Sequence, residues 1–93
     1  MEKPVKAVIT VLGKDRVGII ARVSTVLAVN QVNVLDISQT ILQDYFTMIM
    51  LAEFDNEKIG IPELAEQLNA VGAEMGLQIR VQHEAIFSAM HRV

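Results

Sequence analysis

The chain has 93 residues, close to the shortest length at which a single hydrophobic core stabilises a fold. We therefore expect one domain spanning residues 1–93, because a second domain would have too few residues to bury its own core. Apolar residues make up 52% of the sequence, more than so small a core can hide, which predicts an oligomer, and we expect a homodimer. The absence of cysteine excludes disulfides, thiolate zinc sites and a cysteine nucleophile.

Charge and hydropathy exclude two further classes of partner. The formal net charge is -3, the basic residues are dispersed among acidic ones, and only one tyrosine and three phenylalanines are available for base stacking, so we expect no nucleic acid binding. Residues 1–6 do not resemble a signal peptide, and no apolar run approaches the roughly 20 residues that span a bilayer. The sequence predicts a cytoplasmic protein with no membrane partner.

The first half of the chain changes its hydrophobic period twice. Residues 5–12 are largely β-branched and apolar on both sides, which predicts a central strand. After a break at residues 13–18, apolar spacings of three and four predict a helix from about Gly18 to Asn30. The period of two then returns, and it predicts a half-buried strand in which Leu35, Ile37 and Ile41 alternate with Asp36, Ser38 and Thr40.

The second half contains a similar series of elements. Gln43 and Asp44 are typical of a turn, and residues 45–54 are apolar on both sides, as in a second central strand. Pro62 suits the first turn of a helix that ends near Gly76, with a buried stripe formed by Ile61, Leu64, Ala65, Leu68, Val71 and Met75. Residues 77–83 then alternate as a strand with one polar side, and a short helix follows from Glu84 to about His91.

The order strand, helix, strand, strand, helix, strand is that of the ferredoxin-like βαββαβ fold, an α+β sandwich. Right-handed crossovers give an antiparallel sheet of order 4-1-3-2 with both helices on one face. The helix-free face then carries four apolar side chains that require a cover, Val8, Leu12, Ile49 and Leu51. The second strand is an edge with a single charge, and the tail at residues 84–93 is too short to be stable unless it docks on a sheet of its own or a neighbouring chain.

Residues 13–18 connect a central strand to a helix N-terminus, where free N–H groups and the helix dipole favour a carboxylate. Gly13 and Gly18 allow close backbone approach, and Asp15 adds a carboxylate that suits an ammonium group. Together these features suit a zwitterion. The alternative is an ordinary helix start, in which Asp15 caps the helix and the glycines serve only the turn.

Two motifs at this spacing resemble those of ACT domains: Asp15-Arg16-Val17-Gly18-Ile19-Ile20-Ala21, and Val32-Asn33-Val34-Leu35-Asp36-Ile37. The resemblance covers essentially the whole chain. It is strongest to small standalone ACT proteins, whose tails are similar to residues 83–91, and it extends to ACT modules of glycine-cleavage regulators and of a glutamine-sensing uridylyltransferase.

The resemblance implies a regulatory domain that dimerises and holds an amino acid between the first loop of one chain and the second strand of another. Asp15 then matches a polar ligand contact, and Asn33 matches the contact from the partner chain. Gly18 matches the glycine that starts the helix, whereas Gly13 stands where serine-inhibited phosphoglycerate dehydrogenase has a histidine. The expected ligand-binding residues are Gly13, Asp15, Arg16, Val17, Gly18, Ile19 and Asn33.

Other functions find less support in the sequence. Ser24, Ser38 and Ser88 have no recognised basic or acidic partner nearby in sequence, so we expect no enzyme activity and no cofactor. His83 and His91 are about two helical turns apart, which does not favour a metal site. The remaining alternative is an interaction module that binds no ligand and pairs with itself or with a regulated enzyme.

Overall fold

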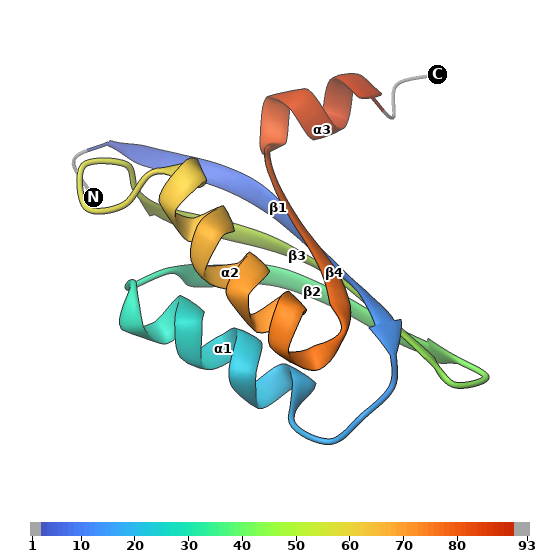
Figure 1. Ribbon diagram of the computed structural model, residues 1–93. Coiled ribbons are helices and arrows are strands. Elements are labelled where there is room, and N and C mark those ends of the chain that lie inside the picture. The colour runs from blue at the N-terminus through green and yellow to red at the C-terminus, as the bar shows by residue number, and fades with distance from the viewer. Residues whose placement is uncertain (1–2, 91–93) are drawn as a thin grey trace.

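Four strands form one antiparallel sheet in the order β2-β3-β1-β4 (Figure 1). The computed structural model describes residues 3–90, and of Met90 only its place in α3. The strands are β1 (Pro4–Lys14), β2 (Asn33–Leu42), β3 (Tyr45–Asp55) and β4 (Leu77–His83), and the helices are α1 (Ile19–Val29), α2 (Ile61–Met75) and α3 (Glu84–Met90). The predicted ferredoxin-like fold, its strand order and its C-terminal helix are confirmed.

Helices α1 and α2 cover one face of the sheet, and the core lies between them and the two central strands (Figure 1). Alternate residues of β1 and β3 point into this layer because successive side chains of a strand lie on opposite faces. The fully buried side chains of the core include Ile9, Val11, Met48, Phe54, Ile19, Val23, Leu64 and Leu68. Met75, predicted on the buried stripe of its helix, lies in this core together with Met48 and Met50 of β3.

Strand β1 is longer than predicted, since it continues through Gly13 to Lys14. Gly13 pairs with Phe46 on β3 and with Leu77 on β4, so it belongs to the sheet and not to the loop. A Cβ atom at Gly13 would lie 2.6 Å from Leu77 Cδ2 and 3.1 Å from the Gly76 carbonyl oxygen. The sequence pattern ended the strand at residue 12 because glycine has no side chain to continue the alternation.

The prediction that β2 is half-buried is wrong. Every residue of β2 is exposed, including the apolar residues that were expected to face the core: Ile37 is 50% and Ile41 is 49% exposed. The register explains part of this difference, because Val34 pairs with Ala52 while Asp36 pairs with Leu51, which leaves Leu35 in a bulge. The alternating sequence placed the side chains on two sides correctly after the bulge, but it contained no information on whether a helix covers them.

The helix-free face is partly covered by the chain's own tail. Helix α3 contacts β1 and β4, and Phe87 lines a small hollow with Val8 and Leu51. Val8 is only 6% exposed, whereas Leu12 is 46% and Ile49 is 42% exposed. The expectation of an apolar open face therefore holds for Leu12 and Ile49, but not for Val8. Residues 91–93 of the predicted tail lie outside the described residues.

Candidate functional site

The loop between β1 and α1 is anchored to the hairpin that connects β2 and β3. The backbone N–H of Asp15 donates a hydrogen bond of 2.7 Å to the carbonyl oxygen of Asp44. This bond fixes the loop at one end of the sheet and leaves the Asp15 side chain exposed to solvent. The carboxylate of Asp15, which was predicted to bind a ligand, therefore lies in the loop that precedes α1. It forms no ion pair with another residue in 3–90.

Helix α1 begins without a side-chain cap. Its N-cap residue is Gly18, whose φ of +95° is a left-handed conformation that favours glycine. The N-cap makes no side-chain hydrogen bond, and the first turn contains no acidic residue. The alternative in which Asp15 caps the helix is therefore wrong. The first N–H groups of α1 remain available to an anion, at the positive end of the helix dipole.

Most of the predicted loop residues lie on the surface. Asp15 and Arg16 are exposed, and Val17 is 97% exposed, while Ile19 is buried in the core. The pKa of Glu74 on α2 is lowered, mainly by its hydrogen bond with Arg22 and to a smaller extent by the charges of Arg22 and Arg16. Arg16 therefore contributes to the positive potential around the loop.

Asn33 lies at the opposite end of the sheet from this loop. It pairs with Glu53, which in turn pairs with Lys6, whereas the loop starts after Lys14. Along β1, the position level with Asn33 (Lys6) and the start of the loop (Lys14) are eight residues apart, which corresponds to about 26 Å. Within one chain, Asp15 and Asn33 are not brought together, so only a second chain can unite them in one site.

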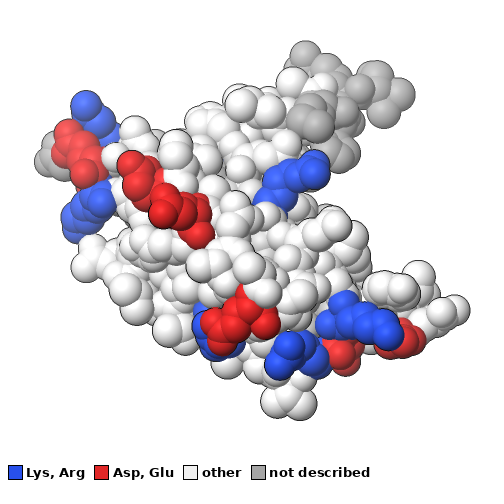
Figure 2. Space-filling view, in the orientation of Figure 1, with Lys and Arg blue, Asp and Glu red and all other residues white. Residues whose placement is uncertain are grey.

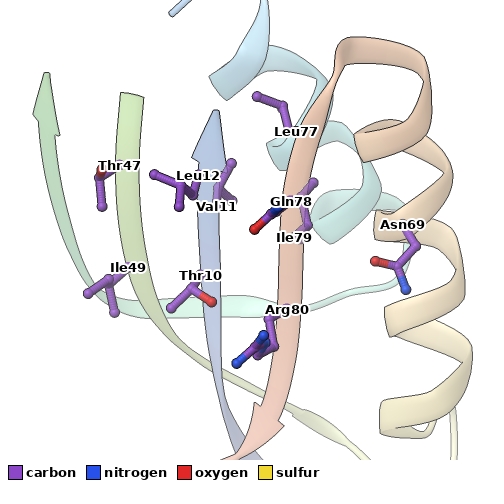
Figure 3. A pocket seen from close by; sticks show the side chains of 10 residues that line it. All are labelled: Thr10, Val11, Leu12, Thr47, Ile49, Asn69, Leu77, Gln78, Ile79 and Arg80. Atoms are coloured by element: carbon purple, nitrogen blue, oxygen red, sulfur yellow. The ribbon is translucent and has the colours of Figure 1, made fainter. Parts of the chain in front are cut away.

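A hollow of about 650 Å³ lies where sequence reasoning predicted no site (Figure 3). It includes none of the seven predicted residues. Its lining includes six side chains from the helix-free face of three adjacent strands: Thr10, Leu12, Thr47, Ile49, Gln78 and Arg80. The sequence does show that some of these strand positions are polar. Polar residues on one side of a strand usually mean only that this side faces solvent, and their alignment into one hollow depends on the strand register.

On the face that α1 and α2 cover, several small clusters contain both acidic and basic side chains, and one acidic group and one basic group stand apart from them (Figure 2). Among residues 3–90, no group of three or more metal-ligating side chains occurs. His83 has a local structural contact, because its Nδ1 accepts a hydrogen bond of 3.1 Å from the N–H of Ala85 at the start of α3. None of the helices in the described part of the chain is long and apolar enough to cross a membrane.

Comparison with known proteins identifies the fold and the family. A family model described as an ACT domain matches residues 6–82. A UPF0237 protein of Clostridium acetobutylicum is 50% identical over 88 residues, which cover 95% of this chain and 99% of the relative. A solved ACT domain protein from Streptococcus pneumoniae is 42% identical with a TM-score of 0.77, and the match covers 94% of this chain and 98% of that one.

A more distant structure shares the fold alone. A putative glycine cleavage system transcriptional repressor has a TM-score of 0.78 at 24% identity, over 86% of this chain and 46% of its own. The family match extends over both central strands, both long helices and the β1–α1 loop. On the combined basis of its βαββαβ architecture, this match and relatives of nearly equal length, the chain belongs to the ACT domain family.

Proposed function

We propose that this protein is a cytoplasmic, non-catalytic regulatory homodimer that binds an amino acid between its two subunits. The observation that supports this proposal most directly is that α1 begins without a side-chain cap, next to the exposed carboxylate of Asp15. Free N–H groups suit an α-carboxylate, and the aspartate suits an α-ammonium group. Membership of the ACT family, whose domains are typically regulatory and bind ligands, supports the same function.

The exposed edge of β2 supports a dimer of a particular geometry. Its outer N–H and C=O groups have no strand partner among residues 3–90, since β2 is the first strand in the sheet order. If two copies of β2 pair antiparallel about a two-fold axis through the middle of the strand, Asn33 of one copy lies opposite Leu42 of the other. Leu42 precedes the hairpin turn whose Asp44 carbonyl holds Asp15. This pairing therefore brings Asn33 of the partner to the end of the sheet that carries the loop.

Each residue of the loop then has a distinct role. The backbone N–H groups in the first turn of α1 bind the α-carboxylate, and Gly18 provides the left-handed turn that precedes them. Ile19 holds this turn against the core with its buried side chain. Asp15 and the partner's Asn33 bind the ammonium group and polar atoms of the ligand. Arg16 and Val17 form the rim. Gly13 contributes only its backbone at the end of β1, because the Cβ atom of any larger residue would collide with Leu77.

A mixing experiment tests whether one site is built from two chains. Asp15→Ala and Asn33→Ala should each abolish amino acid binding, measured by isothermal titration after wild-type protein has identified a ligand. A heterodimer of the two variants retains one intact site, because one chain supplies Asp15 and the other supplies Asn33. An equal mixture should therefore recover about one quarter of the wild-type sites. If the mixture binds nothing although heterodimers form, the two residues do not share an intersubunit site.

Assembly without a ligand is the second candidate, and the exposure of every residue of β2 favours it independently of the loop. In that case the protein pairs through β2 with itself or with a regulated enzyme. Asp15→Ala would then leave its regulatory activity intact, whereas a charge on the β2 edge would abolish it. The two candidates thus differ in their sensitivity to a single substitution in the loop.

A further inference from the structure

The hollow lies over the helix-free face and extends past the edge strand β4 to Asn69 of α2 (Figure 3). On the helix-free face it combines polar and apolar side chains in two neighbouring rows. In one row, Thr10 lies between Ile49 and Arg80. In the next row, Leu12 lies between Thr47 and Gln78. The rows are two residues apart along each strand, a separation of about 7 Å, so one small molecule can contact both of them.

Within the described part of the chain, Arg80 is the only cationic side chain that lines this hollow. It makes no ion pair or side-chain hydrogen bond with any residue among 3–90, so its five N–H donors are available. The ten described residues of the lining include no carboxylate that could neutralise it. Asp36 is the acidic residue of the same face on β2, but it lies at the opposite edge of the sheet.

We propose that this hollow is a second small-molecule site, specific for a monocarboxylate that carries an apolar group and no ammonium group, such as a branched 2-oxo acid. The guanidinium of Arg80 can bind a carboxylate through two parallel hydrogen bonds. Thr10 and Gln78 lie next to it and supply further hydrogen-bond donors, while Leu12 and Ile49 provide the apolar surface. A volume of about 650 Å³ is within the range of small-molecule sites.

The charge of the lining decides between classes of ligand. A single arginine matches one negative charge, so a phosphate with nearly two charges would remain partly unpaired. An amino acid would bring its ammonium group towards a cation with no carboxylate to receive it, which is unfavourable. The hollow therefore selects the acid without an ammonium group, whereas the loop at Asp15 is suited to the zwitterion. The inference does not depend on the proposed function, because the two sites share no residue.

The test compares 4-methyl-2-oxopentanoate with leucine, which differs only in having an ammonium group in place of the oxo group. Backbone amide signals of the ¹⁵N-labelled full chain are followed by NMR during each titration. The oxo acid should produce saturable shifts at Thr10, Thr47, Gln78 and Arg80, and leucine should leave these four signals unchanged. Arg80→Gln should weaken binding roughly ten- to hundredfold, and Thr10→Val should weaken it less. Lys58→Gln, which removes an exposed cation elsewhere, should have no effect.

Three results would overturn the inference. The first is that the oxo acid produces no saturable shift at these four amides. The second is that leucine, acetate and chloride produce shifts as large as those of the oxo acid, which would indicate non-specific anion binding. The third is unchanged affinity in Arg80→Gln, whose fold is checked by the dispersion of its amide signals. Shifts confined to residues 15–19 would place the acid at the loop and would contradict this site while leaving the proposed function intact. Absence of any amino acid binding would contradict only the proposed function.

Discussion

At the scale of single residues, two glycines with similar sequence surroundings have different roles. Gly18 adopts a φ of +95° that starts α1, and a Cβ atom there would still have room, since its nearest neighbour would be Met75 Cε at 3.8 Å. Gly13 is an ordinary strand residue, but its Cβ would collide with Leu77. Sequence alone indicated that both glycines matter. It could not distinguish a glycine that is required by its positive φ from one that is required because a Cβ atom would clash, since the residue type is the same in both cases.

We predict that Gly18→Ala lowers the free energy of unfolding by about 1 kcal/mol or more, because an L side chain is strained at this φ. Urea denaturation measures this change. Gly60→Ala is the matched control, since the φ of Gly60 is -96° and its added Cβ would meet mainly the flexible end of Glu63. Equal destabilisation by the two substitutions would show that backbone conformation is not the cause.

At the scale of elements, the contact between α2 and β4 depends on a glycine that sequence reasoning did not single out. Gly72 is buried, and a Cβ atom at this position would lie 2.6 Å from the backbone carbonyl oxygen of Leu77. Because a backbone atom cannot rotate away, helix and strand would have to separate. We predict that Gly72→Ala costs about 1–3 kcal/mol of folding free energy. Ala73→Gly tests the opposite change at an exposed helical position and should cost no more than about 1 kcal/mol.

The two long helices are also joined by an ion pair. Arg22 of α1 donates two hydrogen bonds to the Glu74 carboxylate of α2, one of them at 2.6 Å between Nη2 and Oε2. This hydrogen bond is the main reason that the pKa of Glu74 lies below its ordinary value of 4.5. A carboxylate whose folded pKa is depressed contributes stability above its unfolded pKa and loses it as the pH falls through the folded pKa.

We therefore predict that Glu74→Gln destabilises the protein slightly at pH 7, and that the difference from wild type disappears at a pH below the lowered pKa of Glu74. Thermal unfolding of both proteins between pH 7 and pH 3 provides the measurement. Glu66→Gln, at another exposed carboxylate of α2, is the control and should show no such convergence. A difference that stays constant over this range would contradict the linkage.

At the scale of the whole molecule, the sequence predicted the fold because two independent patterns agreed. The strands that are apolar on both sides are the central ones, and the order of elements matches one known architecture. Burial of β2 was predicted wrongly because an alternating sequence shows which side chains share a face of the strand, but not whether a helix packs on that face. The hollow was missed because it arises from the alignment of Thr10, Thr47 and Arg80 across three strands. Within the loop, the uncapped start of α1 could be anticipated from Gly18, but the anchoring of Asp15 to Asp44 could not.

The β2 edge gives a prediction about assembly. Ile37→Lys introduces a charge at a half-exposed apolar position of β2 and should convert the proposed dimer into a monomer. Ile86→Lys is the matched control, because Ile86 is similarly exposed, at 56%, but belongs to α3, which contacts β1 and β4. Sedimentation velocity distinguishes the two states. A monomer in Ile86→Lys together with a dimer in Ile37→Lys would indicate that another surface forms the interface.

The central claim is that the dimer binds an amino acid at the β1–α1 loop. Isothermal titration of purified ligand-free protein with each of the twenty amino acids is the most direct test. We predict saturable heat with at least one amino acid, at one site per chain, and its loss in Asp15→Ala. No heat with any of the twenty, from protein that sedimentation shows to be dimeric, would contradict the claim.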